Sequence, residues 1–237
     1  MSVKSELSGD VVPGSWQRLL ALSGVAFAVL FVVGWFASGG DAPDYGAPDQ
    51  DWVNWADDNQ WKSRVGAFAM LLAGFVFLHF AATIRTALGS AETNARGVAE
   101  LARVAFAGSI TGMAGMTMAI VIISSATTEG GDVNPSVTRA IASASAGPFL
   151  LSAMGFAALL MAAGLLTLRS GVFARWTGVV ALIGAVSFLV AFAAVLSGLG
   201  EDSIFGFGFF PGVLALVIWS IFTSVANYRA ATEAADV

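Results

Sequence analysis

The sequence predicts an all-α polytopic membrane protein, a bundle of six transmembrane helices that forms a single integral membrane domain over residues 1–237. Hydrophobic residues make up 57% of the chain and charged residues 11%, whereas soluble domains are roughly 45–50% apolar and 25% charged. The uncharged runs are each about as long as the 20 residues that a helix needs to cross the hydrocarbon core. The expected spans are approximately residues 19–38, 65–85, 104–124, 147–168, 176–197 and 208–228.

The first uncharged run, residues 19–40, follows a short polar segment that ends in Arg18. It is longer than the 7–15 apolar residues of a signal peptide, and further spans follow it. We therefore interpret it as an uncleaved first helix.

A loop rich in aspartate and tryptophan separates the first two spans. From Asp49, a plausible N-cap, Trp52 and Trp55 recur at helical spacing. Because indole rings favour the headgroup level, a short amphipathic interfacial helix is expected near residues 49–60. Trp52, Trp55 and Trp61 are candidate ligand-binding residues, and the alternative is that these tryptophans merely cap the bundle.

His79 is the only histidine, and it lies inside the uncharged run between Arg64 and Arg85. An ionisable residue within the bilayer is costly and is by default a functional candidate. Three roles remain open for His79: a structural imidazole, a group that binds a ligand or handles protons, and a metal or haem ligand.

Met113 and Met116 share a face of the third span, and thioethers suit Cu(I). Met118 points away from them at 100° per residue, and this pair lies deeper than His79. Both methionines are kept as candidate ligand-binding residues, but filling gaps in the core is the simpler interpretation. No metal site and no cofactor are predicted.

Small residues recur every three or four positions in two spans. Gly108, Gly112 and Gly115 form such a stripe in the third span, and Gly178 belongs to one in the fifth. Small residues allow close approach of backbones in lipid. These glycines are predicted helix-packing positions, with the third and fifth spans as the central pair.

Before the sixth span, phenylalanines alternate with Gly206 and Gly208. They could line an opening for an apolar molecule. We favour an extended stretch that leads into a helix with Pro211 in its first turn.

Basic residues are distributed unequally between the two sides. With six spans, both termini share one side, which holds Lys4, Arg18, Arg85, Arg96, Arg103, Arg169, Arg175 and Arg229. The other side holds Lys62, Arg64 and Arg139. By the positive-inside rule both termini are cytoplasmic. The excess of Arg over Lys favours a prokaryote, so the expected location is its plasma (cytoplasmic) membrane.

Catalytic patterns are missing from the sequence. The chain has no cysteine, no acidic residue within a span, and no glycine-rich nucleotide loop. Ser124 has no base near it in sequence, so it does not form a triad. Solvated negative charge, rather than a cation site, is the interpretation of Glu129, Asp132, Glu201 and Asp202. No catalytic residue and no enzymatic activity are predicted.

Three segments carry a resemblance to a known group of proteins. They are the amphipathic loop leading into residues 62–85, the basic turn LLTLRSGVFARW at residues 165–176, and the terminal helix with Tyr228 and Arg229. Together they resemble the six-span bacterial membrane proteins grouped as domains of unknown function, common in actinobacteria. The resemblance implies topology and a plasma-membrane location, and it brings no activity.

The sequence therefore favours a non-enzymatic multi-pass protein that binds an apolar ligand or lipid, or acts as an accessory membrane subunit. Expected partners are the lipid bilayer, an apolar small molecule or lipid, and a membrane protein or a second copy of the chain; no nucleic acid is expected. A secondary transporter of a small molecule and a membrane-embedded haem or metal redox protein are the alternatives.

Overall fold

A computed structural model describes residues 15–38, 42–92, 100–127, 134–196 and 204–233. Over these residues the chain is helical and contains no strand, which confirms the predicted all-α fold. The elements are α1 (Ser15–Ala21), α2 (Ser23–Ala37), α3 (Asp49–Glu92), α4 (Leu101–Ser125), α5 (Pro135–Ala144), α6 (Ala146–Ser170), α7 (Arg175–Ala193), the short 3₁₀ helix η2 (Ala194–Leu196) and α8 (Phe205–Glu233).

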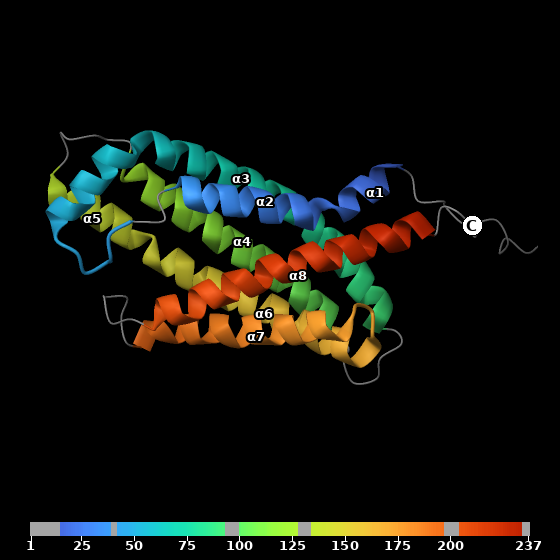
Figure 1. The fold of residues 1–237 in the computed structure, drawn as a ribbon. Helices are drawn as coiled ribbons and strands as arrows, with labels where there is room; N and C mark the ends of the chain where they lie inside the picture. Colours follow the sequence, from blue (N-terminus) through green and yellow to red (C-terminus); the bar gives the residue numbers. More distant parts are fainter. Residues whose placement is uncertain (1–14, 39–41, 93–99, 128–133, 197–203, 234–237) are drawn as a thin grey trace, which may run out of the picture.

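The long helices form a closed ring (Figure 1). Going round it, α2, α3, α4, α6, α7 and α8 each pack on the next, and α8 packs on α2. The N-terminal helix α1 and the last turns of α8 lie at the same end of the bundle, at the right of Figure 1, and we call it the terminal end. The other end, where α5 lies, is the far end. The helical segments α3, α4, α5–α6, α7 and α8 are long and apolar enough to cross a membrane, whereas α2 has 15 residues and is shorter.

The predicted first span is not one helix, because the chain breaks at Leu22 between α1 and α2. Leu22 has φ −85° and ψ 1°, outside the helical region. The hydroxyl of Ser23 donates to the carbonyl of Leu20 at 2.6 Å. A Ser–Gly pair is a recognised site of helix kinks, and here Ser23 and Gly24 follow the break directly.

The prediction of a short, separate interfacial helix near residues 49–60 is wrong. These residues are the first turns of α3, which continues for 44 residues to Glu92. No glycine or proline interrupts the chain between Asp49 and Val65, so nothing in the local sequence ends the helix. At 1.5 Å per residue α3 is about 66 Å long, roughly twice the hydrocarbon thickness.

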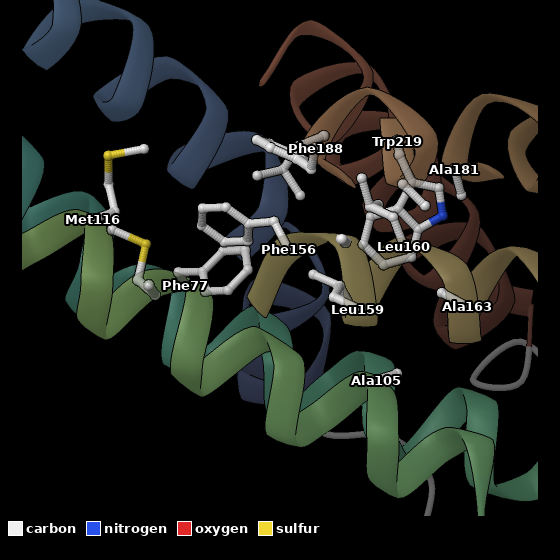
Figure 2. Close-up of a cluster of buried hydrophobic side chains, with 14 of the residues drawn as sticks. Phe77, Ala105, Met116, Phe156, Leu159, Leu160, Ala163, Ala181, Phe188 and Trp219 are labelled. Carbon is white, nitrogen blue, oxygen red and sulfur yellow. The ribbon is translucent and has the colours of Figure 1, made fainter. Parts of the chain in front are cut away.

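The core is filled by aromatic and small side chains from every helix of the ring. Figure 2 shows part of it, with labelled residues from α3, α4, α6, α7 and α8. Phe156 of α6 lies 6.1 Å from Phe77 of α3 and 5.5 Å from Phe188 of α7, measured between ring centroids. Trp219 of α8 meets Phe80 of α3 edge-on at 5.6 Å. Rings at such separations pack a core densely.

Gly108, Gly112 and Gly115 all face α6. A Cβ atom at Gly108 would lie 2.6 Å from the carbonyl oxygen of Gly155, so only glycine permits this approach. Gly178 also faces α6, since a Cβ there would lie 3.0 Å from the side chain of Leu168. The predicted pairing of the third with the fifth span is therefore wrong: α4 and α7 both pack on α6, which lies between them.

The turn between α6 and α7 requires one glycine in a left-handed conformation. Gly171 has φ +69°, and its N–H donates to the carbonyl of Thr167 at 3.0 Å. This is a common way to end a helix. The turn places Arg169 and Arg175 at the terminal end.

α8 begins at Phe205, so the predicted extended stretch before Pro211 is wrong. A Cβ atom at Gly208 would lie 2.3 Å from the backbone nitrogen of Ala191 in α7. The glycine that suggested an extended strand instead lets α8 approach the backbone of α7.

Candidate functional site: a groove between α1, α3 and α8

An open groove of about 360 Å³ lies at the terminal end of the bundle. The break at Leu22 redirects α1 relative to α2 (Figure 1), and the groove lies between α1, the last turns of α3 and the last turns of α8. It is lined by Leu20, Ala21, Thr83, Thr86, Ala87, Ser90, Asn227 and Ala231. Apolar and polar groups therefore share one small surface.

The α3 wall of the groove carries three hydroxyls at helical spacing. Thr83, Thr86 and Ser90 recur at intervals of three and four, which puts them on one face. Their hydroxyls donate to the carbonyls of His79, Ala82 and Ala87 at 3.0, 3.2 and 2.8 Å. Each hydrogen is thus satisfied within α3. Hydroxyl oxygens have two acceptor lone pairs, so those of Thr83 and Thr86 can accept from a bound group.

The α8 wall ends a stripe of polar residues. Ser220, Thr223 and Ser224 are fully buried in the bundle, and Asn227 follows them on the same side of the helix. The amide nitrogen Nδ2 of Asn227 is buried and has no hydrogen-bond partner among the described residues. An unsatisfied buried donor is costly, so Asn227 is the lining residue with the clearest capacity to bind a ligand.

Arg18 of α1 supplies a second unpaired donor. Its Nε is buried and has no partner among the described residues. Arg18 precedes Ala21, a lining residue, by three positions, so the two lie on one side of α1. None of the lining residues within the described part of the chain is acidic.

His79, which lies within the second predicted span, points outward from the bundle. Its ring meets that of Phe75 edge-on at 5.2 Å, and Phe75 is itself exposed on the outer surface of α3. His79 follows Phe75 by four residues, so both belong to the outward stripe of the helix. The structure does not bring His79 together with the tryptophans or the methionines.

The predicted tryptophans separate into two environments. Trp52 and Trp55 are buried, at 1% and 7% exposure, in a cluster with Ala56, Ala126 and Ala142 that we call the α3–α5 cap. Trp61 is 75% exposed and lies outside this cluster. Trp52 and Trp55 therefore pack the far end of the bundle and do not form a surface platform.

Polar contacts fasten the α3–α5 cap. Tyr45 and Ser145 share a hydrogen bond of 3.0 Å between their hydroxyl oxygens, and Arg139 donates to Asp49 at 3.0 Å. Burial raises the pKa of Tyr45, and the hydrogen bond with Ser145 offsets part of that rise.

Met113 and Met116 are buried, whereas Met118 is exposed. A Cβ atom at Gly74 would lie 3.3 Å from the methyl group of Met113, so this methionine fills the space between α3 and α4. Among the described residues, no group of three His, Asp or Glu side chains could hold a metal ion. The acidic residues Glu129, Asp132, Glu201 and Asp202 lie outside the described part of the chain.

The sequence reasoning missed the groove. Its signal was present as two polar stripes, Thr83–Thr86–Ser90 and Ser220–Ser224–Asn227, within otherwise apolar runs. No charged residue marks either stripe, and an inventory based on charge and histidine passes over hydroxyls and amides.

Comparison with known proteins gives one match. Residues 22–223 match the family described as Domain of unknown function (DUF4386). None of the curated proteins and none of the solved structures matches the chain. The expected resemblance to a family of unknown function is thereby confirmed.

Proposed function

The chain belongs to the DUF4386 family, whose function is unknown, and from that premise we propose that it is a non-enzymatic six-span membrane protein that holds a membrane lipid in the groove between α1, α3 and α8. In this proposal α1 and α2 together make the first of the six crossings, in addition to the five made by α3, α4, α5–α6, α7 and α8. Measured along the two helices, residues 19–37 give a path of about 29 Å at 1.5 Å per residue, close to the hydrocarbon thickness, and the change of direction at Leu22 makes the end-to-end distance shorter.

The terminal end faces the cytoplasm in this proposal. α1, the last turns of α3 and α8, the start of α4 and the turn between α6 and α7 lie at that end (Figure 1). By sequence position these segments carry six of the nine basic residues in the described part of the chain: Arg18, Arg85, Arg103, Arg169, Arg175 and Arg229. Lys62, Arg64 and Arg139 lie toward the far end. The positive-inside rule then sets the orientation, in the cytoplasmic membrane of a prokaryote.

One observation carries the lipid assignment: the groove combines apolar residues with hydroxyls and an unpaired amide at the level of Arg18 and Arg85. Basic residues at the ends of spans lie near the lipid headgroups. A lipid presents ester and glycerol oxygens at that level, with acyl chains that continue toward the bilayer centre. Leu20, Ala21 and Ala87 fit the apolar part of such a molecule.

Native mass spectrometry of the gently solubilised protein tests the proposal, with two matched threonine variants. Thr86 lines the groove, and Thr117 of α4 does not. Both hydroxyls donate to the carbonyl four residues earlier in their own helix. Thr86→Val should lower the fraction of protein that retains a lipid, and Thr117→Val should leave it unchanged. Loss of lipid in neither variant, or in both equally, contradicts the proposal.

A further inference from the structure

We infer that the groove selects phospholipids whose headgroup has a net negative charge, and that Arg18 and Asn227 bind the phosphate of that headgroup. This inference rests on the proposed lipid-binding function and adds the chemical class of the ligand. Its basis is two buried nitrogen donors without a partner among the described residues: the Nδ2 of Asn227, which lines the groove, and the Nε of Arg18, which lies one helical turn before the lining residue Ala21.

The two donors, the Nε of Arg18 and the Nδ2 of Asn227, have no hydrogen-bond partner among the described residues. Removing part of a cation from water without a partner is more costly than leaving a neutral amide unpaired. An acceptor that reaches both groups satisfies them together, and an anionic acceptor compensates the charge of Arg18 as well.

A phosphate group is an acceptor that fits these two donors. Guanidinium groups bind phosphates with two parallel hydrogen bonds, and such charge-assisted bonds are roughly twice as strong as neutral ones. Among the described residues, the groove lining contains no carboxylate that could take this role or repel an anion. Hydroxyl oxygens and an amide surround the rest of the surface, which suits the hydroxyl and ester groups next to a phosphate.

Arginines of α1, α3 and α8 lie at the terminal end, and they differ in the direction that they face. Arg85 lies over the ring of Phe106 at 5.0 Å and so faces α4. Arg229 follows Asn227 by two positions, about 200° round α8, and is exposed. We therefore assign the role to Arg18, which lies one turn before the lining residue Ala21, whereas Arg229 carries the same charge at the same end of the bundle but points away from the groove.

Lipid competition on the full-length protein in nanodiscs or detergent tests the inference. The probes are phosphatidylglycerol, which is anionic, phosphatidylcholine, which is zwitterionic, and inorganic phosphate. We expect retained phosphatidylglycerol to exceed phosphatidylcholine by about tenfold, which corresponds to about 1.4 kcal/mol. Arg18→Gln should bring the two lipids to parity, while Arg229→Gln should keep the preference. Equal melting temperatures for the two variants ensure that both are folded.

Each other outcome has a separate meaning. Equal retention of both lipids by the wild-type protein overturns the charge selection and leaves the proposed function standing. Retention of no lipid overturns both. Binding of inorganic phosphate without lipid shows a site for free phosphate, which overturns the lipid assignment. An equal loss of preference in Arg18→Gln and Arg229→Gln overturns the role of Arg18.

Discussion

The backbone N–H of Gly24 in α2 donates to the hydroxyl oxygen of Ser224 in α8 at 2.9 Å. In an unbroken helix this N–H would bond to the carbonyl of Leu20, which here accepts from the hydroxyl of Ser23. The break at Leu22 is thus compensated by two serine hydroxyls. A Cβ atom at Gly24 would lie 2.3 Å from the Ser224 oxygen, so this contact also requires glycine.

Ser224→Ala should destabilise the bundle more than Ser220→Ala. Both serines are fully buried in α8. Loss of the Ser224 hydroxyl leaves the N–H of Gly24 unsatisfied, at a cost of about 1–3 kcal/mol. Ser220 donates only to the carbonyl of Leu216 in its own helix, and that carbonyl keeps its helical partner. Thermal unfolding in detergent measures the difference, and similar melting temperatures for the two variants would show that the Gly24 contact is unimportant.

Gly155→Ala should weaken the contact between α4 and α6, and Gly147→Ala should not. Both glycines lie in α6. A Cβ atom at Gly155 would lie 2.2 Å from the backbone nitrogen of Gly112, whereas a Cβ atom at Gly147 meets nothing within 4 Å. Overpacking of this kind costs about 1–3 kcal/mol or more, and Gly147→Ala should gain roughly 0.5–1 kcal/mol from helix propensity. Denaturant titration followed by tryptophan fluorescence compares them; opposite signs of the two stability changes are expected.

Trp52→Ala should cost far more stability than Trp61→Ala. The side chain of Trp52 is fully buried in the α3–α5 cap, and that of Trp61 is outward. Truncation of a buried Trp leaves a cavity and costs about 3–5 kcal/mol. Calorimetric melting temperatures provide the measurement. If Trp61→Ala proves the more damaging of the two, the assignment of Trp52 to the core of the cap is wrong.

The stability of the protein should fall above about pH 10 partly because of Tyr45. Its pKa in the folded protein is raised by burial. The unfolded chain therefore loses its proton first as the pH rises, so the contribution of Tyr45 is complete below the unfolded pKa and is lost as the pH rises through the folded pKa. The chain has two tyrosines, so the tyrosinate absorbance of the wild-type protein minus that of Tyr45→Phe isolates the titration of Tyr45.

The melting temperature of the wild-type protein should fall more steeply with pH in this range than that of Tyr45→Phe. Other groups titrate in both proteins and cancel in the comparison. An absorbance midpoint for Tyr45 at or below about 10, or parallel melting curves, would contradict the assigned environment.

The helical fold could be predicted from the sequence because length and apolarity act locally. The spans around residues 104–124 and 176–197 correspond closely to α4 and α7. The positions of Gly108 and Gly112 could be predicted as contacts for the same reason, since their spacing selects one face of a helix. The identity of the helix that this face contacts could not be predicted, because small residues permit close approach to any neighbour. The position of α6 beside α4 depends on how all the helices of the ring pack.

The groove and the placement of His79 needed the structure. Which side of α3 faces outward depends on how the helix is rotated within the bundle, and apolar residues cover both sides of α3. Phe77 is buried and Phe75 outward, although their side chains are identical. Likewise the break at Leu22 depends on Ser224, two hundred residues further along the chain.

The length of α3 gives the two ends of the molecule a common wall. The same uninterrupted helix supplies Trp52 to the α3–α5 cap and Thr86 to the groove, about 51 Å apart along its axis. Because one uninterrupted helix belongs to both, a change in the tilt of α3 would move residues of the cap and residues of the groove together.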